Sequence, residues 1–248
     1  MRRYLAPLAL ALLLPFTATA QNTGMDMSDA DRAAFRAEVR AYLLANPEVI
    51  FEAVQILEDR QAAQQSQTDA EMVTSNLDEL YDTTKSWEGG NPDGDVTLVE
   101  FIDYRCSYCR RAHDEVQELV ASDGNIRLIT KEFPILGEAS VASSRFAIAV
   151  LQLAGRDTYK LVNDALIRLR GEPDEATLSQ LAIEVGLDPA EILAHAATDA
   201  VTEVIDANRA LAQRLEIRGT PTFVMNGEML RGYLPLDQMR AAVDAVRG

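Results

Sequence analysis

The sequence predicts an α/β protein whose sheet is interrupted by a helical insertion and preceded by a helical extension. Three features of the 248-residue chain point to this class. Strand and helix patterns alternate over residues 96–133, a long helical stretch covers residues 139 to about 215, and two short strands and a helix close the chain. Strands and helices that alternate in this way are typical of a layered α/β sheet.

The start of the chain has the pattern of a signal peptide. Arg2 and Arg3 supply the positive charge, residues 5–16 form the apolar run, and residues 18–20 form the small-residue cleavage site. The apolar run is too short to span a bilayer. We therefore expect residues 1–20 to be cleaved on export, with the mature protein in the periplasm.

Residues 21–85 are expected to form a helical extension. Ser28 and Asp31 have capping-box spacing, and residues 46–48 (Asn-Pro-Glu) read as a second helix start. Apolar side chains recur at helical spacing through both segments: Phe35, Val39, Tyr42, Leu43, Ile50, Val54 and Leu57. The polar stretch 61–75 reads either as an exposed helix or as a flexible joint.

The sheet domain is expected to cover residues 86–248. A turn cluster at residues 89–94 marks its boundary. The expected elements are strands at 96–102, 126–133, 222–225 and 229–233, a helix at 107–120 and a last helix from 235. Breaks in the helical insertion are expected at Gly155, at 171–173 and at 186–189, and an Asn226–Gly227 turn joins the closing strands.

The charge balance excludes one class of partner. The chain carries 39 acidic and 23 basic residues, a net charge of −16. Such a field repels the phosphates of nucleic acids and anionic membranes. We expect no nucleic-acid partner.

The only two cysteines, Cys106 and Cys109, are separated by two residues. Stabilising disulfides of exported proteins usually join distant points, because long closed loops restrict the unfolded chain most. A bridge across two residues restricts the unfolded chain very little. The spacing therefore favours redox chemistry over a structural disulfide.

Metal and haem sites fit this pair poorly. A zinc site needs about four ligands, and only His113 and His195 are left to complete one. Covalent haem attachment needs a histidine at the position of Arg110. We expect no metal site.

Cys106 is expected where a strand ends and a helix begins. The free N–H groups and the dipole at a helix N-terminus favour a thiolate, and Arg105, Arg110 and Arg111 add positive charge nearby. Cys109, one turn further along, should be more buried and protonated. These properties match an attacking thiolate and a resolving thiol.

Glu100 lies in the middle of a strand with apolar neighbours. A buried acid is costly unless it has a partner or a role, and near Cys109 it can accept and return that thiol's proton. The alternative is a strand edge that faces water. Lys131 reads either as a charge partner or as a solvated strand residue.

Residues 219–222 (Gly-Thr-Pro-Thr) come just before a strand. Proline is excluded from strand interiors and often marks a special turn, so Pro221 is a candidate for a cis peptide bond. A trans bond is the default from the residues alone.

Three separated segments resemble the DsbA family of thioredoxin-fold proteins: residues 90–109, the helical block and residues 219–223. The resemblance implies a thioredoxin-like fold over residues 86–248, with the helical domain inserted at about 139–215. It implies thiol–disulfide oxidoreductase activity through a redox-active Cys106–Cys109 disulfide, and no other cofactor.

The same resemblance assigns roles to individual residues. Cys106 matches the nucleophile, Cys109 the resolving thiol and Glu100 the buried acid. Pro221 matches the cis-proline that faces the disulfide, and Thr220 offers backbone groups that pair with a substrate strand.

The N-terminal segment 42–50 resembles ScsC-like members of the family, which include proteins that trimerise through it. Two apolar helices without a domain of their own need a cover. We expect residues 28–60 to form a homotrimer interface. The alternative is that they pack back on the sheet domain.

The residues between the cysteines, Ser107 and Tyr108, lack the histidine of the strongly oxidising DsbA proteins, and Thr220 before the proline resembles the isomerase members. We therefore expect a disulfide isomerase or reductase that acts on exported cysteine-containing proteins and is kept reduced by a membrane partner. The alternatives are a DsbA-type oxidase and a protein that binds Cu(I) through the two thiolates.

Overall fold

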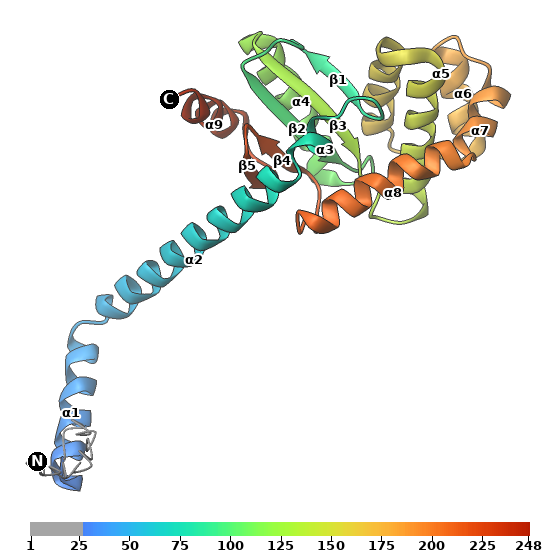
Figure 1. The fold of residues 1–248 in the computed structure, drawn as a ribbon. Coiled ribbons are helices and arrows are strands. Elements are labelled where there is room, and N and C mark those ends of the chain that lie inside the picture. Colours follow the sequence, from blue (N-terminus) through green and yellow to red (C-terminus); the bar gives the residue numbers. More distant parts are fainter. Residues whose placement is uncertain (1–26) are drawn as a thin grey trace, which may run out of the picture. The chain divides into compact units, whose positions relative to one another are not determined.

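A computed structural model describes residues 27–248 (Figure 1). The predicted signal peptide, residues 1–20, lies outside this range. The described chain divides into two compact units, one ending at Glu58 and the other covering Asp59–Gly248. None of the helices in the described range is both long enough and apolar enough to cross a membrane.

The N-terminal unit consists of α1 (Asp29–Ala45) and the first part of α2 (Glu48–Ser75). The predicted capping box is present, because the Ser28 side chain accepts from the backbone of Asp31 and Asp31 bonds back to Ser28. No residue of α1 is buried. Most large apolar side chains of this unit are 40–77% exposed: Phe35, Val39, Tyr42, Leu44, Ile50, Phe51, Val54, Ile56 and Leu57.

The larger unit is built on a five-stranded sheet in the order β1-β3-β2-β4-β5. Its strands are β1 (Trp87–Gly90), β2 (Val96–Ile102), β3 (Ile126–Glu132), β4 (Thr222–Met225) and β5 (Glu228–Arg231). Its helices are α3 (Leu77–Tyr81), α4 (Ser107–Asp123), α5 (Glu138–Arg168), α6 (Glu175–Glu184), α7 (Pro189–Ala196), α8 (Asp199–Arg214) and α9 (Leu236–Arg247). Only the β2–β3 pair is parallel among the described strands, and α5–α8 lie between β3 and β4 in the chain. The predicted α/β class with a helical insertion is confirmed.

The helical insertion is divided where glycines and caps occur. Gly155 has a φ of 82° and kinks α5, and the predicted breaks near residues 171–173 and 186–189 are present. A further break at Ala197 and Thr198, which the sequence reading missed, separates α7 from α8.

The first strand corrects one prediction. Residues 89 and 90 read as a turn, but they end β1, which pairs antiparallel with β3. The indole ring of Trp87 lies over Gly89, so that a Cβ there would be 2.1 Å from the ring. Gly89 is therefore a strand residue without a side chain because the tryptophan takes that space.

Residues 59–85 belong to the same compact unit as the sheet. Val73 and Leu80 are fully buried in the core cluster that also contains Phe101. Asp69 is buried and pairs with Arg231 of β5 at 2.7 Å. The unit therefore starts well before residue 86, where the turn cluster suggested a boundary.

The sheet has a core on each face. Leu98 and Ile102 of β2 pack in a cluster with residues of α4, α5 and α9. Val99 and Phe101, which point the other way, pack with residues of α2, α3 and α8. Because β2 is buried on both faces, any polar side chain that it carries lies deep in the protein.

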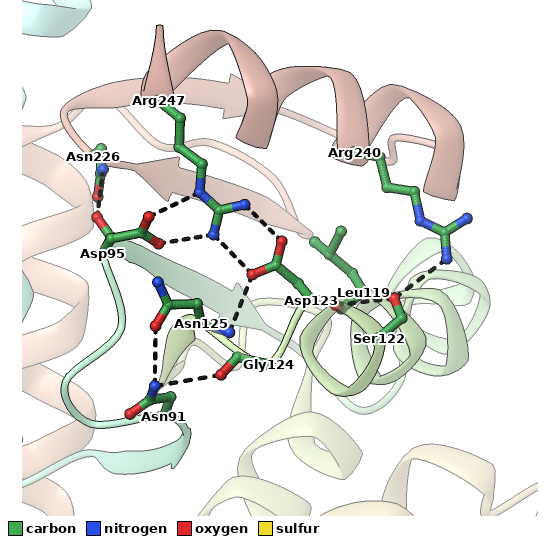
Figure 2. Close-up of polar contacts among 10 residues, drawn as sticks. All are labelled: Asn91, Asp95, Leu119, Ser122, Asp123, Gly124, Asn125, Asn226, Arg240 and Arg247. Atoms are coloured by element: carbon green, nitrogen blue, oxygen red, sulfur yellow. Dashed lines mark hydrogen bonds and ion pairs between the residues drawn. The ribbon is translucent and has the colours of Figure 1, made fainter.

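An ion-pair network fixes the end of the chain (Figure 2). Arg247 of α9 donates to Asp95, just before β2, at 2.8 Å. It also donates to Asp123, at the end of α4, at 2.7 Å. Asn226 donates to the backbone oxygen of Asp95 at 3.1 Å. The last helix is thus tied to the residue before the central strand β2 and to the helix that carries Cys109.

Leu80→Ala should lower the free energy of unfolding by about 2–5 kcal/mol, because it leaves a cavity in a core that the sheet shares. The measurement is urea unfolding of the purified protein. Leu161→Ala, at a side chain that is 58% exposed, is the matched control and should change stability by less than about 0.5 kcal/mol. Equal effects would show that α3 is not part of the core.

Candidate functional site

The turn between β2 and α4 presents Cys106 at the N-cap of the helix, as predicted. Buried Asp103 braces this turn, since its Oδ1 accepts from Arg105 N at 2.8 Å and its Oδ2 from Ile135 N at 2.8 Å. The backbone oxygen of Asp103 accepts from Cys106 N at 3.1 Å. The sequence reading gave Asp103 no role, although Asp after a strand is a common turn residue that bonds backbone two positions on.

Several donors favour the thiolate of Cys106. The thiol of Cys109 has the largest effect, burial acts in the opposite direction, and the Thr220 hydroxyl and the N–H groups of Cys109 and Tyr108 add to the lowering. Together they lower the pKa of Cys106 to about 5. The predicted effect of the helix N-terminus is present in the two backbone N–H groups.

Cys109 has the opposite properties. It is 1% exposed, and burial raises the pKa of its thiol far above the ordinary value. Its hydrogen bond to Cys106 and the charge of Glu100 raise that pKa further. The pair therefore consists of a thiolate on Cys106, which is 7% exposed, and a more deeply buried, protonated thiol on Cys109.

Two of the three nearby arginines have structural roles. Arg105 donates to the Gly171 oxygen at 2.8 Å, and Arg110 donates to the oxygens of Tyr104 at 3.0 Å and Leu169 at 2.8 Å. Both thus join the cysteine turn to the loop that follows α5. The sequence reading assigned them only a charge effect.

Glu100 lies in the centre of the sheet, on β2 between β3 and β4. It is 6% exposed, so the alternative of a strand edge that faces water is wrong. Burial, with a further contribution from the charge of Glu132, raises the pKa of Glu100 to about 8. A carboxyl of this acidity exchanges protons near neutral pH.

Both interpretations of Lys131 are wrong. Its neighbour across the ladder is Phe101, so its side chain lies on the opposite face of the sheet from Glu100. Its Nζ donates to the backbone oxygens of Glu79 at 3.0 Å and Asp82 at 2.9 Å, and the residue is 3% exposed. Lys131 holds the segment around α3 against the sheet.

The loop before β4 lies next to Cys106 in space, although it is far from it in the sequence. The peptide bond between Thr220 and Pro221 is cis, and Pro221 is buried. Cys106 Sγ lies 3.1 Å from the Thr220 oxygen, to which the thiol form donates. The structure therefore brings Thr220 and Cys106 together although 114 positions separate them.

The two residues between the cysteines face solvent. Ser107 is exposed at the first position of α4, and Tyr108 is 57% exposed. Tyr108 stacks on Tyr233 with ring centroids 6.3 Å apart, and the Arg111 guanidinium lies 4.4 Å from the centre of the Tyr233 ring. Tyr233 follows β5 and was missed, because nothing in its local sequence connects it with the cysteines.

An open cavity of about 550 Å³ lies beside the cis-proline loop. Its lining includes Gln65, Glu216, Arg218, Thr220, Thr222 and Arg231. The cavity therefore opens next to Thr220, whose oxygen lies near Cys106.

A second buried carboxyl, Glu132, was also missed. It ends β3, is 3% exposed and accepts from the hydroxyls of Tyr104 and Tyr159 at 2.6 Å each. Its neighbours along the strand are Lys131 and Phe133, so the flanking apolar residues that singled out Glu100 are absent on one side. Within residues 27–248, no three His, Cys, Asp or Glu side chains gather closely enough to hold a metal ion.

Comparison with known families gives two matches. Residues 82–245 match the thioredoxin family, and residues 31–64 match the copper resistance protein ScsC N-terminal domain. The first match lies within the larger unit, and the second begins in the N-terminal unit and ends at residue 64.

Solved structures agree with these matches. A thioredoxin-like oxidoreductase from Silicibacter pomeroyi is 41% identical, with a TM-score of 0.64 over 68% of this chain and 96% of that one. ScsC from Proteus mirabilis, in a transitional conformation, is 26% identical, with a TM-score of 0.65 over 89% and 96%. The thiol-disulfide exchange protein α-DsbA2 from Wolbachia pipientis is 25% identical, with a TM-score of 0.68 over 74% and 98%.

Among curated relatives, the Na⁺/H⁺ antiporter NhaA 1 of Salinispora arenicola is 29% identical over 155 residues, which is 62% of this chain. The chain spans about a quarter of the length of this relative, 24%. The match therefore concerns one part of that protein.

The thioredoxin match covers more than half of the chain, and the predicted thioredoxin-like fold is confirmed. The N-terminal match and the ScsC structure extend the likeness to the helical extension. The chain therefore belongs to the thioredoxin family of thiol–disulfide oxidoreductases, in its DsbA-like, ScsC-type branch.

Proposed function

We propose that this protein catalyses thiol–disulfide exchange on exported cysteine-containing proteins in the periplasm, as an isomerase or reductase kept reduced by a membrane partner. The observation that carries the proposal is the asymmetry of the cysteine pair. Cys106 is a thiolate at neutral pH and lies 3.1 Å from the oxygen of Thr220, which lines an open cavity, whereas Cys109 is buried and protonated. An attacking thiolate and a reserve thiol are the parts that exchange needs.

The proposed reaction begins when the Cys106 thiolate attacks a sulfur of a substrate disulfide. A bond forms between Cys106 and that sulfur, and the other substrate sulfur leaves as a thiolate. In isomerisation, a substrate thiolate then attacks the mixed disulfide and frees Cys106. In reduction, Cys109 gives its proton to Glu100 and bonds to Cys106, and the substrate sulfur leaves as a thiolate.

The Thr220 backbone is proposed to hold the substrate as an extra strand. Its carbonyl already lies 3.1 Å from the attacking sulfur, and the cavity beside it is open. Main-chain pairing binds many sequences alike, as an enzyme that repairs varied proteins requires.

We propose further that residues 28–60 assemble the chain into a homotrimer. The exposed apolar side chains of α1 and the start of α2 support this, because such faces are rarely left in water. The match of residues 31–64 to the ScsC N-terminal domain supports it too. Several sites around one substrate favour repeated attack, which isomerisation needs.

The oxidase alternative depends on the same couple. A strongly stabilised thiolate makes a disulfide more oxidising, since the reduced form is then favoured. The Cys106 thiolate is stabilised, but less than the most oxidising members achieve. Two adjacent thiolates also suit Cu(I), and copper binding stays the alternative prediction for the pair.

The thiolate of Cys106 should appear with a midpoint near pH 5, measured by absorbance at 240 nm against Cys106→Ser. Since folding lowers this pKa, the free energy of unfolding of the reduced protein relative to Cys106→Ser should rise as pH increases from about 5 to 8.5. That contribution is lost as pH falls through 5.

Thr220→Val should raise the pH midpoint of the Cys106 thiolate, and Thr222→Val should not. A wild-type midpoint near 8.5 would contradict the assignment of Cys106 as the thiolate.

The reduction potential of the Cys106–Cys109 couple should lie at about −190 mV. In this chemistry, a nucleophile pKa near 7 accompanies about −270 mV, and one near 3.5 accompanies about −120 mV. Equilibration with glutathione buffers gives the value. A result near −120 mV would support the oxidase, and one near −270 mV would support a reductase that does not isomerise.

Replacing Ile50 and Val54 together by lysine should give a monomer by light scattering, where the wild type has three times the chain mass. The monomer should reactivate scrambled ribonuclease poorly but still reduce insulin, because its cysteine site is intact. Leu161→Lys, at an exposed leucine of α5, is the matched control and should leave both unchanged. Full isomerase activity in the monomer would refute the trimer proposal, and exchange by Cys106→Ala would refute the proposed function.

A further inference from the structure

Glu132 is held by groups from two parts of the fold. Its Oε1 accepts from Tyr104, in the cysteine turn, and from Tyr159, in the helical insertion, at 2.6 Å each. Asn163 donates to the Tyr104 hydroxyl at 3.1 Å, and Asn208 donates to the backbone oxygen of Glu132 at 2.9 Å. Such an arrangement fixes the carboxyl in one orientation.

The second carboxyl oxygen of Glu132 lacks such hydrogen bonds. Oε2 of Glu132 is buried and accepts no hydrogen bond from the described residues, and the hydroxyls of Ser140 and Ser144 are buried and likewise unpartnered there. A carboxylate with one oxygen that accepts hydrogen bonds and one oxygen that accepts none is only partly stabilised. The charged and the neutral form of Glu132 are therefore close in free energy.

The sheet register places Glu132 on the same face as Glu100. In the parallel β2–β3 pair, Glu100 lies opposite Thr130 and Ile102 lies opposite Glu132. Side chains of paired residues point to one face, and positions two apart on a strand share it. The two carboxyls are diagonal neighbours on the face where Ile102 and Cys109 pack in one core cluster.

Several groups act on the ionisation of Glu132. Tyr104 from the cysteine turn and Tyr159 and Ser144 from α5 favour its charged form, and the charge of Asp103 disfavours it. Burial has the largest effect and raises the pKa of Glu132 to about 7, close to that of Glu100. From β2, Glu100 is the like-charged neighbour, and the charge of Glu132 is one cause of its raised pKa.

We propose that Glu132 is a positioning residue for proton transfer at Cys109: its charge controls the ionisation of Glu100, and the two carboxyls hold one proton between them. When Cys109 attacks the mixed disulfide, its thiol proton passes to the Glu100 carboxylate. The Cys109–Cys106 bond forms, the bond from Cys106 to the substrate breaks, and its electron pair leaves with the substrate sulfur. A charged Glu132 makes Glu100 the stronger base for this step.

This inference rests on the role proposed above for Glu100, but its test does not require turnover. The oxidised protein, labelled with ¹³C at glutamate side chains, is titrated by NMR, and the Glu100 signal is assigned with Glu100→Gln. In Glu132→Gln the Glu100 midpoint should fall by about 1 pH unit, because a like charge is removed while the acceptor for the tyrosines is kept. Glu115→Gln, on α4, is the matched control and should leave that midpoint in place.

A kinetic readout should move in the same direction. Reduced protein releases two thionitrobenzoate ions from Ellman's reagent, the second when Cys109 attacks. The pH profile of this second release should shift to lower pH in Glu132→Gln and stay unchanged in Glu115→Gln. A purely structural role of Glu132 would change stability without moving either profile.

Tyr159→Phe provides a second route, since it removes one hydrogen bond from the Glu132 carboxylate and leaves the carboxyl itself. Glu132 should then stay neutral to higher pH, and the Glu100 midpoint should fall. If the Glu100 midpoint is unchanged in folded Glu132→Gln, the inference is overturned. If that variant does not fold, an unchanged midpoint in Tyr159→Phe overturns it instead. Loss of the proposed function is recognised separately, by exchange that persists in Cys106→Ala.

Discussion

The cost of placing charge in the centre of a sheet is the constraint on which the rest of the site depends. β2 is buried on both faces, yet it carries Glu100 beneath Cys109. Because water does not reach them, the acid and the lower thiol favour their neutral forms. Cys106, one helical turn higher, can then carry the only negative charge of the pair. The direction of the chemistry follows from depth in the fold.

The helical insertion is connected to this arrangement by polar contacts as well as by packing. Arg105 and Arg110 bond carbonyls in the loop after α5, and Tyr159 of α5 bonds Glu132. These contacts meet at the turn that leads into α4. The insertion therefore helps set both the position of the cysteines and the charge behind them, and is more than a cover for the sheet.

Local patterns predicted the fold class, the cysteine pair and Glu100 well, because spacing along one strand and one helix places these residues. Contacts between distant segments were beyond such patterns: the approach of Thr220 to Cys106 came only from family resemblance. β3 is buried on both faces, so no alternation distinguished the face of Lys131 from that of Glu132. The strand β1 was not predicted, because glycine at position 89 is typical of a turn. Its place in a strand depends on the contact with the ring of Trp87, which the sequence does not show.

Trp87 is the only tryptophan in the chain. Its ring stacks on Tyr159 with centroids 5.7 Å apart, and its Nε1 donates to the Arg156 oxygen at 2.9 Å. The phenol that it touches is one of the two that bond to Glu132. A single tryptophan, whose emission can be excited apart from that of the tyrosines, therefore lies one ring away from the second buried acid.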